Sequence, residues 1–161
     1  MSADPITSDN NCPFCKKTNA DYFLESENFA AIYNISPIVP GHSLIIPKKH
    51  VESLFDLSKD ELAEFMLLGR NTAKLINHFF HTDAFDWAIQ EKEAAGQSVA
   101  HLHMHVVPRK MNDLPNPGAW YQALEKSEDG IDTFDRFRLS EEHMRELTVR
   151  LKDEAEKLNF E

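Results

Sequence analysis

The order of apolar and polar positions divides the chain into short strands and two long amphipathic helices. Strands are predicted where short apolar runs lie between turn formers, at 22–25, 29–34, 43–46 and 84–90. The first two flank the turn signal Ser26-Glu27-Asn28, which favours a hairpin, and Pro47 ends the third. Because helical segments lie between and after the strands, the pattern predicts an α+β fold on a mostly antiparallel sheet.

The clearest helix is predicted over 57–80. Ser58 and Glu61 have the spacing of a capping box at its start. Its expected buried face consists of Leu62, Phe65, Met66, Ala73, Ile76 and Phe79. A last helix is predicted from Ser140 to Leu158, with a buried stripe of Met144, Leu147, Leu151, Ala155 and Leu158. We expect the long helix to pack on one face of the sheet.

Segment 101–107 alternates sharply between polar and apolar residues. A strand here would point His101, His103 and His105 to one side and apolar residues to the other. Alternate side chains lie roughly 6.5–7 Å apart along a strand. Three interpretations are open: satisfied or solvent-facing histidines, a metal site, or an imidazole that attacks phosphorus.

The only two cysteines, Cys12 and Cys15, form the sequence Cys-Pro-Phe-Cys. This spacing suits a metal site or a redox pair, but no thioredoxin-like βαβ context follows it. Two free thiols are the third alternative. A stable disulfide is not expected, because the chain is expected to be cytoplasmic.

Charge and composition narrow the class of partner. The formal net charge is −10, which argues against binding a nucleic-acid backbone. No apolar run approaches the roughly 20 residues that span a bilayer, so no membrane partner is expected. Residues 1–11 are polar and acidic, which predicts a loose tail and no signal peptide. Local cations near the histidines are Lys48, Lys49, Arg109 and Lys110.

Two stretches together resemble the signature of the histidine triad (HIT) superfamily. They are Gly96 to Lys110, which contains His-Leu-His-Met-His, and Asn34 to Pro47, in the same order as in that family. The similarity runs from about Cys12 to Leu124. It is closest to the fragile-histidine-triad branch and its bacterial relatives, because the Trp-Pro-Pro-Gly ending of the phosphoramidase branch is absent and His105 occupies the third triad position.

The resemblance implies an architecture and an activity. It implies a five-stranded, mostly antiparallel sheet with a catalytic domain at 12–110 and a mobile loop and C-terminal helical extension at 111–161. It implies a homodimer that acts on a small nucleotide such as a dinucleoside polyphosphate. In this family a nucleotidyl-histidine forms at the α-phosphate and is then hydrolysed to a nucleoside monophosphate, with no cofactor for catalysis.

The resemblance also assigns roles to residues. His103 matches the nucleophile, with a backbone carbonyl near His101 orienting it, and His105 matches the histidine that contacts the phosphate. His42 matches the histidine that joins the triad from behind. Contacts to ribose and phosphate are implied for Asn34, Gln90, Gly96, Gln97, Ser98 and Val99.

Some bacterial members of the family hold a structural zinc, and this chain has all four matching ligands: Cys12, Cys15, His50 and His101. Trp120 and Tyr121 lie where the dinucleotide-hydrolase branch has a flexible loop, and they are candidates to stack on a second base. Three other functions stay open: an adenosine phosphoramidase, a nucleotide sensor with little turnover, and a zinc-binding interaction protein.

Overall fold

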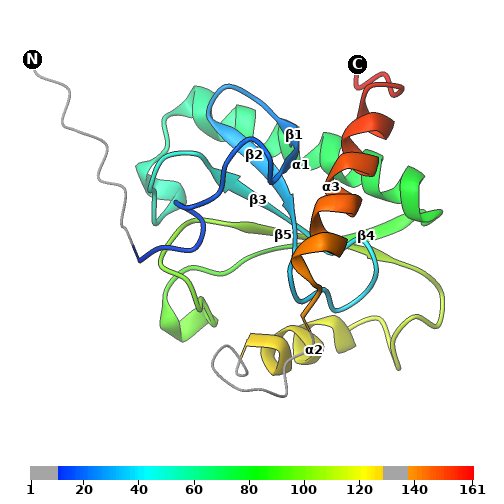
Figure 1. The fold of residues 1–161 in the computed structure, drawn as a ribbon. Helices are drawn as coiled ribbons and strands as arrows, with labels where there is room; N and C mark the ends of the chain where they lie inside the picture. Colours follow the sequence, from blue (N-terminus) through cyan, green and yellow to red (C-terminus); the bar gives the residue numbers. More distant parts are fainter. Residues whose placement is uncertain (1–10, 129–137) are drawn as a thin grey trace, which may run out of the picture.

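The computed structural model describes residues 11–128 and 138–161 (Figure 1). The strands are β1 (Tyr22–Glu25), β2 (Phe29–Tyr33), β3 (Ser43–Pro47), β4 (Ala84–Ile89) and β5 (Met104–Arg109). The helices are α1 (Lys59–Phe80), α2 (Ala119–Glu128) and α3 (Glu141–Ala155), with two single 3₁₀ turns, η1 (Leu54–Asp56) and η2 (Glu93–Ala95). The expected α+β class is therefore confirmed.

The strands form one sheet in the order β1-β2-β3-β5-β4, and every pairing is antiparallel. The predicted hairpin is β1–β2, and α1 separates β3 from β4 along the chain. Helix α1 begins at Ser58, whose hydroxyl accepts from the Glu61 amide while the Glu61 carboxylate accepts from the Ser58 amide. The predicted capping box is thus present.

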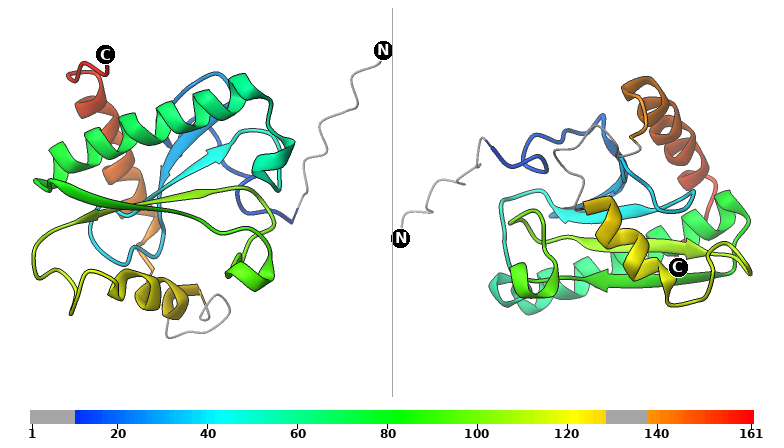
Figure 2. Two further views of the ribbon diagram at one scale, coloured as in Figure 1. Left: turned by 180° about the vertical axis from the view of Figure 1, so that it is seen from behind. Right: turned by 90° about the horizontal axis from the view of Figure 1, so that it is seen from below.

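The two faces of the sheet carry different cores. Ala31, Ile45 and Met104 belong to a large cluster with α1 and α3, which cover one face (Figure 2). On the other face Ile32 and Leu44 join a smaller cluster, against which Phe14 packs. This alternation follows from the period of two along a strand. The second face is therefore left for the N-terminal loop and a binding site.

Register decides on which face the histidines lie. Leu44 of β3 is directly opposite His105 of β5, and directly opposed residues share a face. His105 therefore lies on the Leu44 face, away from α1, while Met104 and Val106 point into the large core. Every residue of β5 is buried, the histidine side included.

Two expectations from the pattern were wrong in detail. Strand β5 begins at Met104, because the ladder with β3 ends at the pair Ile45–Met104; His101 and His103 lie in the segment just before it. Leu62 and Met66 of α1 are about two-fifths exposed (41% and 40%), whereas Phe65, Ala73 and Ile76 are buried as expected.

The segment around Trp120 and Tyr121 differs from the expected flexible loop, since it forms helix α2. Its start follows a turn in which the Ala119 amide donates to the Asn116 carbonyl (3.1 Å). The predicted last helix is α3, and Ser140 caps it as expected.

Gly41, directly before His42, fixes the turn between β2 and β3. Its φ is +96°, and a Cβ there would lie 2.7 Å from Pro108 and 2.9 Å from both Ile76 and Phe80. Gly41→Ala should therefore lower the free energy of unfolding by about 2–4 kcal/mol, through backbone strain and overpacking.

Gly118→Ala is the matched control for that change. A Cβ at Gly118 would meet its nearest atom at 3.6 Å, an ordinary contact. Urea unfolding of both variants measures the difference. Equal stabilities would mean that the turn before His42 tolerates a side chain.

Candidate active site

Four buried imidazoles and one amide meet on the Leu44 face of the sheet. His105 comes from β5, His101 and His103 from the segment before it, and His42 and Asn34 from the two ends of the β2–β3 turn. The four histidines are 0–3% exposed. Buried polar rings are costly without partners, so their hydrogen bonds determine what the site can do.

His103 is held in one tautomer by its own neighbour. Its Nδ1 lies 2.7 Å from the backbone carbonyl of His101, which can only accept, so Nδ1 carries the proton. The lone pair is therefore on Nε2. Burial lowers the pKa of His103 although the same carbonyl raises it, and the ring is neutral at pH 7. A neutral Nε2 is a competent nucleophile.

A relay through His42 sets the opposite tautomer on His105. The Ile38 amide donates to His42 Nδ1 (3.2 Å), so the His42 proton sits on Nε2 and is donated to His105 Nδ1 (3.0 Å). The His105 proton is then on its Nε2. Burial, followed by the neighbouring His42, keeps the pKa of His105 well below its ordinary value. His105 is thus a neutral donor beside a neutral nucleophile.

Asn34 lies beside this network, directly after β2. Its Oδ1 accepts from the Ser36 amide (2.9 Å), which leaves its Nδ2 3.3 Å from His42 Nε2. Because the His42 proton is on Nε2, this Asn34 contact is packing and not a hydrogen bond. Asn34 is 8% exposed and lies at the wall of the adjoining cavity.

A cavity of about 280 Å³ opens beside His103 and His105. Its walls combine apolar side chains with a few polar groups, as small-molecule sites do. Its lining includes the apolar side chains of Phe14, Ile32, Leu44 and Val99 and the polar residues Asn34 and Ser98. Of the expected substrate contacts, Asn34, Ser98 and Val99 line this cavity.

Gln90, Gly96 and Gln97 lie together in the neighbouring loop. Gly96 has φ +88°, and a Cβ there would lie 2.9 Å from Gln90 Nε2, so the close approach requires glycine. Gln97 Oε1 accepts from the Lys92 amide (2.7 Å). Within the described part of the chain, the buried Gln90 Oε1 and Gln97 Nε2 atoms have no hydrogen-bond partner. They are polar atoms that a ligand could satisfy.

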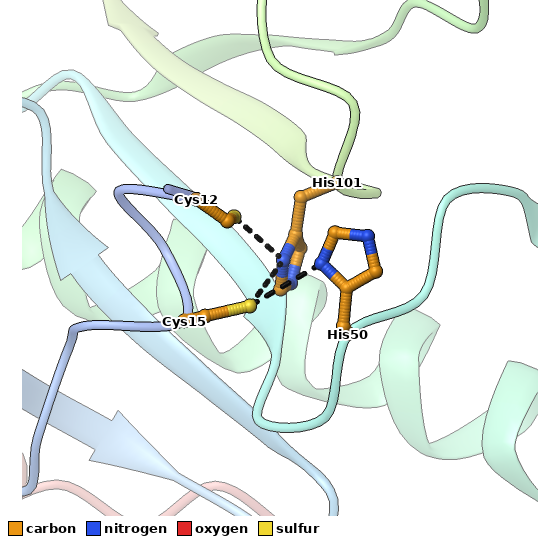
Figure 3. Close-up of side chains that lie close together, drawn as sticks. All are labelled: Cys12, Cys15, His50 and His101. Carbon is orange, nitrogen blue, oxygen red and sulfur yellow. Dashed lines mark hydrogen bonds between the residues drawn. The ribbon is translucent and has the colours of Figure 1, made fainter. Parts of the chain in front are cut away.

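Cys12, Cys15, His50 and His101 converge beside the triad (Figure 3). One ligand atom from each lies within 4.8 Å of all the others. His101 Nδ1 is 3.3 Å from Cys12 Sγ and 3.6 Å from Cys15 Sγ, and His50 Nδ1 is 3.2 Å from Cys15 Sγ. Because His101 Nε2 lies 3.0 Å from the Pro47 carbonyl, its proton is on Nε2 and its Nδ1 lone pair faces the thiols.

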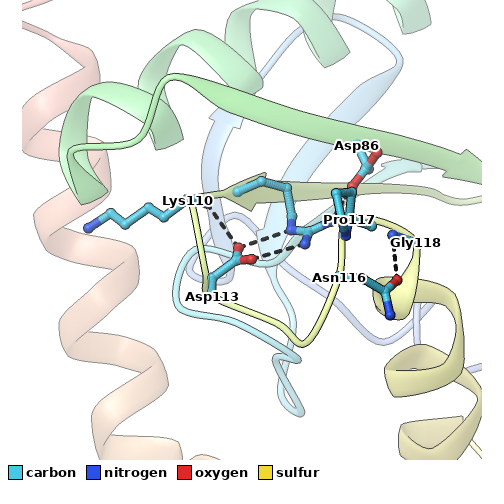
Figure 4. Close-up of polar contacts among 7 residues, drawn as sticks. Asp86, Lys110, Asp113, Asn116, Pro117 and Gly118 are labelled. Carbon is cyan, nitrogen blue, oxygen red and sulfur yellow. Dashed lines mark hydrogen bonds and ion pairs between the residues drawn. The ribbon is translucent and has the colours of Figure 1, made fainter.

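Three of the four cations that the sequence placed near the histidines pair with carboxylates elsewhere. Arg109 binds Asp86 (2.8 Å) and Asp113 (2.9 Å) and thereby holds the turn before α2 (Figure 4). Lys48 pairs with Glu25 and Lys49 with Glu61. Among the described residues, the cations that line the cavity are two others, Lys17 and Arg138, which lie there together with His103, His105, Ser98 and Val99.

Phe14 is a site residue that sequence reasoning missed. Its ring lies edge-on to His103 (centroids 5.2 Å apart) and to His101 (5.5 Å), and it lines the cavity. Its position inside Cys-Pro-Phe-Cys was the available signal. The cysteine spacing drew attention to the thiols and not to the side chain between them.

The chain belongs to the HIT domain family, whose model matches residues 16–112. It is 34% identical over 110 residues to a bis(5'-adenosyl)-triphosphatase of Dictyostelium discoideum, covering 68% of this chain and 74% of that protein. It is 37% identical over 109 residues to an asymmetrical bis(5'-nucleosyl)-tetraphosphatase of Schizosaccharomyces pombe, covering 68% and 60%. The expected family is confirmed. Both relatives are named as hydrolases of nucleotides, which is the class of enzyme expected from the sequence.

Solved structures agree with the fold. The Plasmodium falciparum diadenosine triphosphate hydrolase has a TM-score of 0.69 at 26% identity, covering 90% of this chain and 82% of that one. A zinc-bound histidine triad family protein from Mycobacterium smegmatis has a TM-score of 0.66 at 29% identity, covering 91% and 94%. Among the described residues, no helix has the length and apolar character needed to cross a membrane.

The buried histidines predict a pH dependence of stability. Burial lowers the pKa of His101 from 6.5 to about 4. Between those values the unfolded chain binds more protons than the folded one, so the stability present above pH 6.5 is lost as the pH falls toward 4. The metal-free protein should lose up to about 1.4 kcal/mol per pH unit for each such imidazole.

Urea titrations at pH 7, 6 and 5 with chelator present measure this loss. His143→Asn, which removes an exposed histidine of α3, is the control and should keep the same slope. A free energy of unfolding that stays constant from pH 7 to 5 would contradict neutral, buried imidazoles.

Proposed function

We propose that this protein is a nucleotide hydrolase that cleaves a dinucleoside polyphosphate, or a related nucleotidyl substrate, at the α-phosphate. The observation that carries the proposal is the bond from His103 Nδ1 to the His101 carbonyl, which directs a neutral Nε2 toward the cavity. The names of the two relatives support the same substrate class.

In the first step His103 Nε2 attacks the α-phosphorus. A P–N bond forms as the P–O bond to the leaving nucleotide breaks, and the electron pair goes to that oxygen. The imidazole becomes cationic, and the His101 carbonyl stabilises it through the Nδ1 proton. The His105 Nε2 proton is positioned to donate to the phosphate oxygens as negative charge develops there.

In the second step water attacks the same phosphorus. The P–N bond breaks and its electron pair returns to His103 Nε2, the proton lost by the water passes to solvent, and the nucleoside monophosphate leaves. Dividing one displacement into two is the advantage of nucleophilic catalysis. In this mechanism the described side chains carry out both steps without a cofactor.

The cavity gives the substrate its orientation in this proposal. The apolar wall of Phe14, Ile32 and Leu44 takes the base, and Asn34 binds the ribose. The Gly96 loop, with Gln97, Ser98 and Val99, surrounds the phosphates, and Gln90 contributes its buried amide. Adenosine phosphoramidates would use the same nucleophile, so the leaving group decides between the two hydrolase activities.

The cysteine–histidine cluster is proposed to hold one structural zinc ion. Two thiolates and two neutral imidazoles are a complete tetrahedral set, and sulfur–nitrogen distances of 3.2–3.6 Å suit ligands around one such ion. The zinc-bound relative from Mycobacterium smegmatis supports this assignment. With four protein ligands, zinc would supply cross-linking of the chain and no open position for substrate.

A homodimer is proposed through α1 and β4. Strand β4 is at one edge of the sheet, and an exposed edge invites pairing with another chain. Leu62 and Met66 of α1 and Phe85 of β4 are 40–46% exposed. Apolar side chains of this size on neighbouring elements suit an interface between two copies.

Met66→Glu should convert the dimer to a monomer, because it introduces a charge into the proposed apolar interface. Val149→Glu on α3 is the matched control, since Val149 is also exposed (57%) but belongs to neither element of the proposed interface. Light scattering after size-exclusion chromatography measures the mass. A monomeric wild type would refute the dimer.

His103→Asn should lower release of AMP from diadenosine tri- and tetraphosphate by about 10³-fold or more, because no covalent intermediate can form. His143→Asn should retain wild-type rates. An adenosine phosphoramidate in the same assay identifies the preferred leaving group. If wild type turns over none of these substrates but binds AMP, the protein is a nucleotide sensor and the catalytic proposal fails.

A further inference from the structure

One aromatic ring connects the metal cluster to the nucleotide cavity. Phe14 lies between the two cysteine ligands in the chain, so any ion bound by Cys12 and Cys15 fixes the backbone on both sides of it. Its ring packs against His103 at 5.2 Å between centroids and forms part of the cavity wall. The position of that wall therefore depends on the conformation of the cysteine loop.

A second connection runs through His101. Its Nδ1 faces the two thiols, while its backbone carbonyl accepts the Nδ1 proton of His103. One residue thus contributes a ligand atom to the metal cluster and the acceptor that orients the nucleophile. Bonds from a metal ion to His101 would restrict the ring and the backbone that carries this carbonyl.

The loop also contacts the sheet itself. Phe14 packs against the small cluster on the Leu44 face, and its carbonyl accepts from the Lys17 amide (3.1 Å). These contacts favour the observed position of the ring but form no covalent tie. Metal bonds to two cysteines and to His50 and His101 would fasten the loop to segments 47–50 and 101–103.

From these contacts we propose that metal binding and nucleotide binding are energetically coupled, with Phe14 as the positioning residue that transmits the coupling. The inference rests on the proposed function, since it assumes that the cavity takes a nucleoside monophosphate. Zinc that orders the loop fixes the position of the Phe14 ring before the nucleotide binds. Nucleotide binding then costs less conformational entropy.

Coupling between two binding sites is reciprocal. If zinc raises the affinity for AMP by some factor, then AMP raises the affinity for zinc by the same factor. This equality provides a readout that does not depend on turnover. It also separates a coupled site from a zinc ion that only stabilises the fold, because such an ion would leave the affinity of the folded protein for AMP unchanged.

The test uses the full chain with reductant, in a zinc-loaded form and in a metal-free form prepared with chelator. Calorimetry measures the affinity for AMP in each form, and competition with a chromophoric chelator measures zinc affinity with and without saturating AMP. We expect one zinc per chain, about tenfold weaker AMP binding without metal, and about tenfold tighter zinc binding with AMP.

If the metal-free chain loses its fold, the zinc-loaded Phe14→Ala variant still tests the proposed coupling. All four metal ligands remain, so zinc should still bind without AMP, but AMP should bind about tenfold more weakly and should no longer tighten zinc binding. Phe55→Ala is the matched control, because Phe55 is 95% exposed and lies outside the cavity. It should behave as wild type.

The outcomes separate this inference from the proposed function. Equal AMP affinities in the two folded forms, or AMP-tightened zinc binding that persists in Phe14→Ala, would overturn the coupling and leave the hydrolase proposal standing. A chain that binds AMP but no zinc would overturn the coupling together with the zinc assignment. A chain that binds zinc but no AMP in either form would overturn both the coupling and the nucleotide site.

Discussion

Four imidazoles buried on one face of a sheet can be neutral and ordered only if each ring has defined hydrogen-bond partners. The His101 carbonyl, the Pro47 carbonyl and the Ile38 amide supply them to His103, His101 and His42, and His42 in turn donates to His105. Each backbone group decides which nitrogen of a ring carries the proton. As a result His103 presents a lone pair and His105 presents a proton, which is the division of roles that a displacement at phosphorus needs. The chemistry thus depends on backbone positions as much as on the histidines.

The same constraint explains the supporting structure. The ring of His42 reaches His105 only because the chain turns sharply at Gly41, where three side chains leave no room for a Cβ. Register between β3 and β5 puts His105 on the face away from α1, so the large core and the site use opposite sides of the sheet. Arg109, Asp86 and Asp113 stabilise the turn that follows β5, so the Arg109 cation is used away from the cavity. One face of β5 therefore packs in the large core, and the other face carries a site histidine.

The cysteine loop joins this arrangement from the far N-terminal side. It brings two thiols to His50 and His101 and, between them, an aromatic ring to the nucleotide cavity. The cysteine–histidine cluster and His103, the proposed nucleophile, both contact His101 and the Phe14 ring, and so form one connected unit. The proposed coupling of zinc to nucleotide affinity follows from that connection, and it would let metal availability adjust how well the enzyme holds its ligand.

The sequence by itself determined the hairpin, the capped helices and the family, because turn formers, caps and the His-x-His-x-His spacing are local signals. It also determined which residues are the candidates for the triad, the metal cluster and the phosphate loop. Only the tertiary structure decided where β5 begins, that Leu62 and Met66 of α1 stay exposed, that Arg109 is paired away from the site, and that Phe14 is part of the cavity wall. Each of these depends on a partner distant in the chain, such as Asp86 for Arg109 or His103 for Phe14. The tautomers of the histidines have the same cause: they are set by backbone groups whose approach no local pattern encodes.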